Sequence, residues 1–452
     1  MAEIFPFRGL RYNPSVVSDL DTVVTPPYDV ISPEEQDRYH RLNPHNMIYL
    51  ELGQNMPQDN PQNNAHTRAA GYLQQWQNSS VLIREEQPAI YYYALDYAVS
   101  PQIRKTRYGY ICALRLEDFR TGCVRPHERT FQAIKDERLR LMLACHANLS
   151  PVFALYSDAA LVVDHHLQVA RESQPIIDYQ DSKGQKHRVW RVLERGTQQQ
   201  VRSLMRDKPI FIADGHHRYE TALAYRDLRR KALGKVDSQA CHEFIMVYLS
   251  NMNQTGLTIL PTHRMLRHLG PWEPERFLEA AAQFFEVSSY PVDPHRAGTA
   301  SVEWEAALKT ARETKENCIG FSWNGATRYY SLNARREAVD GYLASQGIPA
   351  VLRSLDVVVL DQIILRCLLG LTDEFLGNER NIHFKHDLTD GLHQVQTGYY
   401  DAGFFINPTR IEQVQEVASA GLIMPHKSTY FYPKAFSGLV INPLNPGEEI
   451  SL

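Results

Sequence analysis

The sequence lacks the signatures of several common kinds of site. Its six cysteines include no CxxC pair, and their spacing fits no usual zinc pattern. Neither GxGxxG nor GxSxG occurs, and the His242-Glu243 pair is not followed by the second histidine of HExxH. The sequence therefore gives no support for Rossmann-type dinucleotide binding, a hydrolase nucleophile elbow or a zincin metalloprotease.

An excess of one charge and a long apolar run are also missing. The 48 Lys and Arg residues are balanced by 52 Asp and Glu residues, which argues against a nucleic-acid partner because such proteins present a basic surface. The most apolar stretch, 351–371, contains four charged residues and predicts a long core helix at 353–369 rather than a membrane span. The first 14 residues lack the apolar core of a signal peptide. We therefore expect a cytoplasmic protein with buried free thiols and no membrane partner.

Helical and strand patterns alternate along the chain. Aromatic and aliphatic residues in 89–98 and 106–116 predict two neighbouring strands. The pattern in 136–147 predicts a helix that buries Leu139, Met142 and Leu143. Other predicted strands are 150–156, 185–192, 243–249, 402–406 and 428–432, with a hairpin in 320–332, and other predicted helices are 64–77, 196–206, 216–233 and 411–420. The mixed order favours an α/β or α+β fold.

A chain of 452 residues is long enough for two or three domains. We predict a main α/β domain over 1–268 and a smaller α+β insert over 269–345. Phe277, Ala281, Phe284 and Phe285 recur at helical spacing and give the insert an amphipathic helix. The C-terminal residues 346–452 are predicted to pack back on the core as a helix and strands.

The DGHHR segment, Asp214–Arg218, carries three potentially cationic side chains in a row. It follows an apolar run, 209–213, and opens a helical pattern, which predicts a strand, a tight turn and a helix N-terminus. Free backbone N–H groups and the positive end of the helix dipole favour an anion there, and imidazole and guanidinium groups suit phosphate. Asp214 is placed to cap the helix, and Gly215 lets a ligand approach the backbone. The alternative is a capped surface helix whose His and Arg side chains face water.

A second charged group contains His127, Glu128 and Arg129, which follow Pro126. Proline favours an extended or turn backbone at this point. A carboxylate between a histidine and an arginine after a strand is a candidate general base if its neighbours keep it ionised. The alternative is a surface cluster of salt bridges.

Three further segments carry candidate ligand contacts. In the rigid TPPYD segment, Tyr28 could stack on a base, and Asp29 could bind Mg²⁺ or orient a histidine. Lys135 and Arg138 lie at the start of a predicted helix. The tail sequence HKST, 426–429, places a lysine before two hydroxyls, which can bind phosphate, although no glycine-rich loop precedes it. The alternative for the TPPYD segment is structural packing, and for Lys135 and Arg138 it is solvated charge. For Lys427 the alternative is a lysine that protects a strand edge.

The chain resembles a prokaryotic protein family, itself uncharacterised, through the stretch ADGHHRYETA (213–222). TPPYDVIS, RPHERT, ANLSPVFALY and MPHKSTYFYPK carry the same resemblance, which covers nearly the whole chain. More distantly, GHHR is similar to the phosphate-contacting motif of the ParB/sulfiredoxin-like fold and its free-serine kinases. This resemblance implies a ParB/sulfiredoxin-like core with large additions, nucleotide phosphates held by the HHR-type motif, and a base glutamate from an earlier segment. Sulfiredoxin needs a cysteine in this motif, and His216 or His217 stands there instead.

Together these features lead to the hypothesis of a nucleotide-dependent phosphotransferase that acts on a small hydroxyl compound. Free L-serine is the first candidate through the kinase resemblance, ATP or ADP is the expected nucleotide, and Mg²⁺ would bridge its phosphates with help from Asp214 or Asp29. A phosphatase or nucleotide hydrolase, a non-catalytic nucleotide-binding regulator, and a site for a carboxylate or sulfate substrate remain open. The predicted catalytic residues are Glu128, His217 and Asp214, the predicted nucleotide contacts are Gly215, His216, His217, Arg218, Lys427, Ser428 and Thr429, and the predicted substrate contacts are Tyr28, Asp29, His127, Arg129, Lys135 and Arg138.

Overall fold

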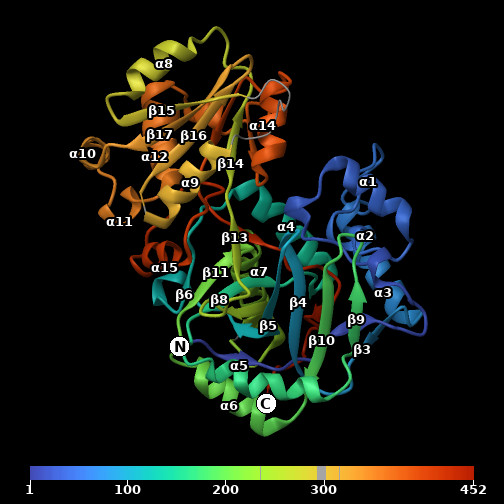
Figure 1. The fold of residues 1–452 in the computed structure, drawn as a ribbon. Helices are drawn as coiled ribbons and strands as arrows, with labels where there is room; N and C mark the ends of the chain where they lie inside the picture. The colour runs from blue at the N-terminus through green and yellow to red at the C-terminus, as the bar shows by residue number, and fades with distance from the viewer. Residues whose placement is uncertain (235, 293–301, 315, 452) are drawn as a thin grey trace. The chain divides into compact units, whose positions relative to one another are not determined.

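The computed structural model describes residues 1–234, 236–292, 302–314 and 316–451 (Figure 1). The chain divides into two compact units. Unit 1 comprises Met1–Pro126, Thr130–Thr258 and Pro433–Leu452, and unit 2 comprises His127–Arg129 and Ile259–Tyr432. The predicted insert, 269–345, falls within unit 2, and its residues 293–301 and 315 lie outside the described residues. The predicted C-terminal segment is shared, because its last residues, from Pro433 onward, belong to unit 1.

Unit 1 is built on a mixed sheet to which nine strands contribute among the described residues (Figure 1). The order is β6-β11-β8-β12-β5-β4-β10-β9, and β1 pairs with β5. The β6–β11 and β8–β12 pairs are parallel, and the other neighbours are antiparallel. The strands are β1 (Ile4–Phe5), β4 (Ile90–Ser100), β5 (Ile103–Arg115), β6 (Val124–Arg125), β8 (Val152–Tyr156), β9 (Ile177–Gln180), β10 (Lys186–Val192), β11 (Ile210–Asp214) and β12 (Phe244–Asn251). This large mixed sheet confirms the mixed α/β class.

Helices of unit 1 pack on the sheet and on one another. α7 lies against β8 and β12, α4 packs between α7 and α3, and α5 packs on α6. The helices are α1 (Pro33–Leu42), α2 (Ile48–Glu51), α3 (Ala65–Asn78), α4 (Gln132–Cys145), α5 (Val162–Leu167), α6 (Arg195–Met205) and α7 (His216–Leu233), with 3-10 turns η1 (Leu20–Thr22), η2 (Tyr28–Val30), η3 (Phe119–Thr121), η4 (Gln168–Glu172) and η5 (Cys241–Glu243). Two small strand pairs complete the unit, β2 (Leu10–Tyr12) with β3 (Leu82–Arg84), and β7 (Ala147–Asn148) with β21 (Asn442–Pro443).

The predicted buried face of α4 is wrong by about one residue. Leu143 is 38% exposed, whereas Arg138, Leu141, Met142 and Cys145 are buried. These four positions follow the i, i+3, i+4, i+7 spacing of a helix face. The face was missed because an arginine occupies one of its positions.

Unit 2 contains an antiparallel sheet of order β15-β17-β16-β19-β14-β18. Its strands are β14 (His263–Leu266), β15 (Phe285–Pro291), β16 (Cys318–Trp323), β17 (Arg328–Ala334), β18 (Ile382–Lys385) and β19 (Ala402–Phe405). β13 (Thr258–Leu260) pairs separately with β20 (Tyr430–Tyr432). The fully buried Trp304 stacks on Tyr329 and meets Phe405 edge to face in the core. The β16–β17 pairing confirms the predicted hairpin.

Two helix predictions in unit 2 are wrong in their extent. The predicted helix 353–369 is confirmed from Asp356 to Leu368, where α12 (Asp356–Val359) continues directly into the π-helical η7 (Leu360–Leu368), but α11 (Ala350–Arg353) is separated from it. The break is held by Asn317, whose side-chain amide donates to the Ser354 carbonyl and to Asp356. The predicted helix around Phe277 ends with α8 (Pro274–Ala281), and Phe285 begins β15. The other helices are α9 (Val302–Thr314), α10 (Arg336–Ser345), α13 (Asp373–Leu376), α14 (Leu388–Gln396) and α15 (Ile411–Ser419). Within the described residues, no helix has the length and apolarity that crossing a bilayer requires.

Candidate functional site

The DGHHR segment lies where the buried strand β11 ends and α7 begins. Gly215 is the N-cap of α7 with φ of 91°, a left-handed conformation that glycine adopts without strain. A β-carbon at this position would come within 2.8 Å of Arg218 Nε. Gly215 has no side chain, and α7 makes no side-chain capping bond. The prediction that Asp214 caps the helix is therefore wrong, and the positive end of an 18-residue helix receives no capping carboxylate.

Asp214 is instead held between two buried cations. Its Oδ2 accepts a hydrogen bond from Arg218 Nη2 at 2.7 Å, and its Oδ1 accepts one from Lys434 Nζ. Arg218 and Lys434 are each only 9% exposed. Burial alone would raise the pKa of Asp214, but the charges of Lys434 and Arg218 lower it to about 2. Arg218 also donates from Nη1 to the Pro151 carbonyl, and its buried Nε has no hydrogen-bond partner.

The two histidines of the segment differ in their surroundings. His216 is buried at 4% exposure, and His217 is half-buried beside Phe131. The backbone N–H of Phe131 donates to His217 Nε2 at 2.9 Å, and the two rings stack. Burial also lowers the pKa of His217. An accepting Nε2 requires the neutral imidazole with its proton on Nδ1, so His217 is not a permanent cation as Arg218 and Lys434 are.

The structure brings three predicted substrate contacts to the same cluster. The Arg138 guanidinium lies 4.2 Å from the centre of the Tyr28 ring. Burial and the charge of Asp29 raise the pKa of Tyr28, and the charges of Arg138 and Arg218 act against this. Tyr28, Asp29 and Arg138 therefore share one electrostatic environment with the DGHHR segment.

Lys135 lies beside His217 but is already paired. Its Nζ binds Glu220 Oε2 at 2.7 Å, and the same oxygen accepts a hydrogen bond from Thr130 Oγ1 at 2.9 Å. The charge of Lys135 also lowers the pKa of His217. Lys135 would have to leave Glu220 to bind a substrate directly.

Two residues of this cluster were missed from the sequence. Lys434 ends the MPHKSTYFYPK stretch, in which Lys427 was predicted as the contact instead. Glu51 ends α2 and is 3% exposed, and its Oε1 accepts a hydrogen bond from Ser150 Oγ at 2.8 Å. A carboxylate within the apolar run IYLEL (48–52) was the available signal, because acidic residues are rarely buried without a specific reason.

The predicted contacts of the tail and of the second charged group meet one another in unit 2. His127 is fully buried, and its Nε2 lies 3.0 Å from Thr429 Oγ1. Ser428 Oγ donates to the Pro425 carbonyl at 2.6 Å, which occupies its proton in a local turn. Lys427 adopts a left-handed φ of 56°.

Arg264 binds the backbone in the same part of unit 2. Its Nη2 donates to the carbonyls of His426 and Lys427 at 3.2 and 3.1 Å. Burial lowers the pKa of Arg264 to about 10, and the nearby carboxylates Asp361 and Glu128 act against this shift. Glu128 is therefore close to a buried arginine in unit 2, while the neighbouring Arg129 is exposed. The predicted site residues fall into two groups, one in each unit.

Few carboxylates of this cluster are available as ligands for Mg²⁺. Among the described residues, no group of three or more His, Cys, Asp or Glu side chains is arranged to hold a metal ion. Both oxygens of Asp214 are bound to cations, so this carboxylate cannot serve Mg²⁺ without losing a partner. Asp29 is exposed and has the carboxylate chemistry that Mg²⁺ accepts together with substrate phosphates.

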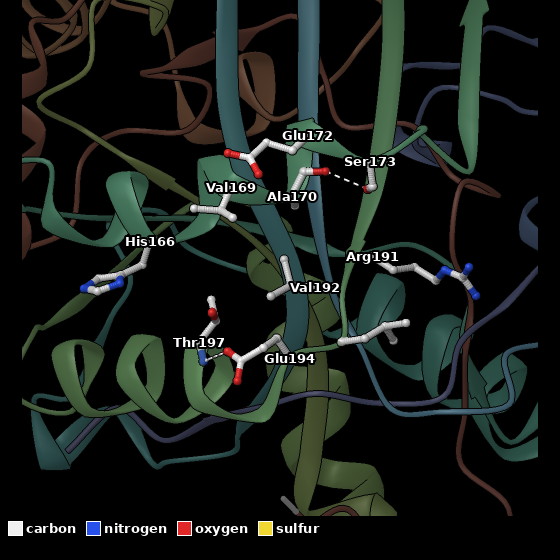
Figure 2. A pocket seen from close by; sticks show the side chains of 10 residues that line it. His166, Val169, Ala170, Glu172, Ser173, Arg191, Val192, Glu194 and Thr197 are labelled. Atoms are coloured by element: carbon white, nitrogen blue, oxygen red, sulfur yellow. Dashed lines mark hydrogen bonds between the residues drawn. The ribbon is translucent and has the colours of Figure 1, made fainter.

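A surface pocket of about 310 Å³ lies elsewhere in unit 1, between η4, the end of β10 and the start of α6 (Figure 2). Three of its polar side chains are engaged with protein groups. Glu194 caps α6 through the Gly196 N–H at 2.8 Å, and Ser173 Oγ donates to the Ala170 carbonyl at 2.8 Å. Arg191 pairs with Glu85 at 2.6 Å. The lining includes no residue of the DGHHR segment.

Comparisons with known proteins place the chain in a family and report distant structural similarity. No curated protein matches the chain. Similar solved structures include a conserved hypothetical protein from Pyrococcus furiosus, with 11% identity, a TM-score of 0.31, and coverage of 69% of this chain and 89% of that one. A free serine kinase in complex with AMP has 12% identity, a TM-score of 0.30, and coverage of 68% and 83%. SbnI with a C-terminal truncation from Staphylococcus aureus has 12% identity, a TM-score of 0.31, and coverage of 75% and 90%.

At these identities and TM-scores, the similarity transfers no activity to this chain. The family match is of a different kind, because it covers more than half of the sequence. Residues 4–358 match the family described as "Protein of unknown function (DUF1015)", and the chain therefore belongs to that family.

Proposed function

We propose that the protein is a nucleotide-dependent phosphotransferase that acts on a small hydroxyl compound. The observation that carries the proposal is the pair of buried cations, Arg218 and Lys434, which share the single carboxylate of Asp214 at the start of α7. The two cations carry one more charge than Asp214 neutralises, and they lie at a helix N-terminus that has no capping side chain, with Asp29 and Glu51 as the other carboxylates that act on Arg218. Phosphoryl transfer depends mainly on charge neutralisation and alignment, which such a cluster supplies.

In this proposal the phosphates of ATP or ADP lie at the start of α7. Arg218 and Lys434 would bind phosphate oxygens in competition with Asp214, and Gly215 would allow close approach of the backbone. His216 would line the same end of the helix, and the neutral His217 would donate from Nδ1. A bound Mg²⁺ would neutralise phosphate charge, with Asp29 as its protein ligand.

The acceptor compound is proposed to lie beside the phosphates. Tyr28, Arg138 and Lys135 are the unit 1 candidates for binding it, and free L-serine is the first compound to test because of the motif resemblance. The residues that the sequence predicted as contacts in unit 2 form a group of their own, in which Glu128 was the predicted base. Its other members are His127, Arg129, Lys427, Ser428 and Thr429.

Mass spectrometry of reaction products tests this function. The full-length protein would be incubated with Mg²⁺, ATP or ADP, and a pool of amino acids and small polyols. Lys434→Met removes one of the two phosphate-binding cations, and Lys208→Met is a matched control that breaks the Lys208–Asp158 pair in the same unit. We expect a phosphorylated compound from the wild type and the control, and at least about 100-fold less from Lys434→Met, as for loss of a charge-stabilising group.

The other outcomes separate the remaining functions. Nucleotide consumption that releases phosphate without a phosphorylated compound would show a hydrolase. Nucleotide binding without any consumption would show a regulator. Equal product from Lys434→Met and the control would refute the assigned role of the cation pair.

A further inference from the structure

Glu51 is a buried carboxylate with one oxygen engaged. Its Oε1 accepts the 2.8 Å hydrogen bond from Ser150, and no donor among the described residues is bonded to Oε2. Arg138 Nη1 donates to the backbone carbonyl of Glu51 at 2.7 Å rather than to its carboxylate. The Ser150 bond fixes the carboxyl group and leaves Oε2 to accept a further proton.

The nearby arginines do not need Glu51 as a counter-ion. Arg138 binds Glu137 through both Nε and Nη2, and Arg218 binds Asp214. Glu51 itself forms no ion pair within 4 Å among the described residues. Burying an unpaired carboxylate is strongly unfavourable. Its retention beside Arg138 and Ser150, near the DGHHR segment, calls for a reason other than stability.

The electrostatic surroundings suit a proton acceptor. Burial and, to a smaller extent, the charge of Asp29 raise the pKa of Glu51, while the charge of Arg138, the Ser150 bond and the charge of Arg218 act in the other direction. A base of raised pKa takes a proton more readily than an ordinary carboxylate, provided that neighbouring positive charges keep it ionised at neutral pH. Arg218, which binds Asp214, also donates from Nη1 to the carbonyl of Pro151, the residue that follows Ser150, so the Glu51–Ser150 bond lies next to a residue of the proposed phosphate site.

We infer that Glu51, rather than Glu128, accepts the proton of the substrate hydroxyl, an inference that rests on the proposed function. The hydroxyl oxygen forms a bond to the terminal phosphorus of the nucleotide as its proton moves to Glu51 Oε2. The bond between that phosphorus and the bridging oxygen breaks, and ATP leaves as ADP or ADP leaves as AMP. Glu51 then releases the proton to solvent. Ser150 is a positioning residue, because it holds the carboxylate without contacting the substrate.

The test uses Glu51→Gln beside Glu243→Gln in the full-length protein. Glu243 is a matched control, since it is also a buried carboxylate of unit 1, and it pairs with Arg230 at the opposite end of α7. ADP binding would be measured by calorimetry, and turnover with the acceptor that the wild type phosphorylates. We expect Glu51→Gln to keep its ADP affinity within about 3-fold and to lose about 10²- to 10⁴-fold in kcat, the range for a general base. Glu243→Gln should keep both.

A pH profile adds a readout that a structural role would not move. Activity should fall on the acid side as Glu51 is protonated, with a midpoint above the ordinary value of 4.5. Ser150→Ala removes a hydrogen bond that favours the ionised form, so the midpoint should move to higher pH. This variant also serves if Glu51→Gln fails to fold.

Failure of the inference can be told apart from failure of the proposed function. A wild type that transfers no phosphoryl group would refute both. Transfer that persists in Glu51→Gln, or that is lost in Glu128→Gln while Glu51→Gln stays active, would overturn only the role of Glu51. Equal loss of ADP affinity and turnover in a folded Glu51→Gln would also overturn it, because Glu51 would then be a binding group.

Discussion

Replacing Asp214 with Asn removes the negative charge between two buried cations. The change keeps the size of the side chain and one acceptor oxygen, but Arg218 and Lys434 then face a neutral amide. The pKa of Asp214 is lowered from 3.8 to about 2, which corresponds to about 2 kcal/mol of stability. Loss of one partner of a buried ion pair typically costs about 3–5 kcal/mol. We therefore expect Asp214→Asn to lower the free energy of unfolding of unit 1 by about 2–5 kcal/mol at pH 7.

The pH dependence of this loss of stability follows from the direction in which the pKa of Asp214 is shifted. Because the folded-state pKa of Asp214 lies below its unfolded value, its contribution is complete above about pH 4 and disappears as pH falls towards 2. The difference between wild type and Asp214→Asn should be constant from pH 8 to pH 5 and should shrink below pH 4. Urea unfolding combined with hydrogen exchange of the α7 amides measures this, since the two units need not unfold together.

The same variant tests whether the cations are available to an anion. We expect Asp214→Asn to bind inorganic pyrophosphate more tightly than the wild type, because no carboxylate has to be displaced. Asp158→Asn is the control, since it removes another buried carboxylate of unit 1 that pairs with Lys208. A stability difference that persists unchanged at pH 2.5, or pyrophosphate affinity that does not rise, would refute the reasoning.

Three further predictions concern single charges. Lys434→Met should weaken pyrophosphate binding at least about 10-fold by calorimetry, because it removes a charge-assisted contact, and unchanged affinity would contradict this. Burial raises the pKa of Asp356 from 3.8 to about 7, so the stability of unit 2 should fall by at most about 4 kcal/mol as pH rises from 4 to 7 in urea unfolding, and Asp356→Asn should flatten that slope. Arg107 is fully buried over the Phe153 and Tyr248 rings and forms no ion pair with a carboxylate among the described residues. Arg107→Met should therefore raise the free energy of unfolding by about 1–3 kcal/mol, and a loss of stability would show that the ring contacts compensate the buried charge.

Local features of this fold were predictable from the sequence because their causes are local. The start of α7 at His216 follows from an apolar strand, a glycine that adopts positive φ, and a helical pattern that begins immediately. The pairing of β4 with β5 likewise follows from two aromatic runs joined by a short turn. The mixed α/β class rests on the alternation of such elements and needs no knowledge of distant contacts.

Other features depend on contacts between distant segments and were missed. Lys434 reaches Asp214 from 220 positions along the chain, and no local pattern marks which lysine of the tail does so. Arg138 faces inward because Glu137 and the Tyr28 ring compensate its charge, which a rule based on apolar spacing cannot foresee. Glu51 was missed for a similar reason, since its neighbours come from α4 and α7.

The cation pair also explains why an acidic residue stands in a segment predicted to bind phosphate. Two cations buried at about 9% exposure would be strongly destabilising without a counter-charge, and Asp214 supplies one when no ligand is present. A ligand must then compete with an ionised carboxylate that already binds both cations. A monoanion gains little from such an exchange, whereas a polyphosphate can bind the displaced cations and the helix N-terminus together. If the DGHHR segment is the proposed phosphate site, the role of Asp214 as an internal counter-charge favours multiply charged phosphates over carboxylates as its ligands.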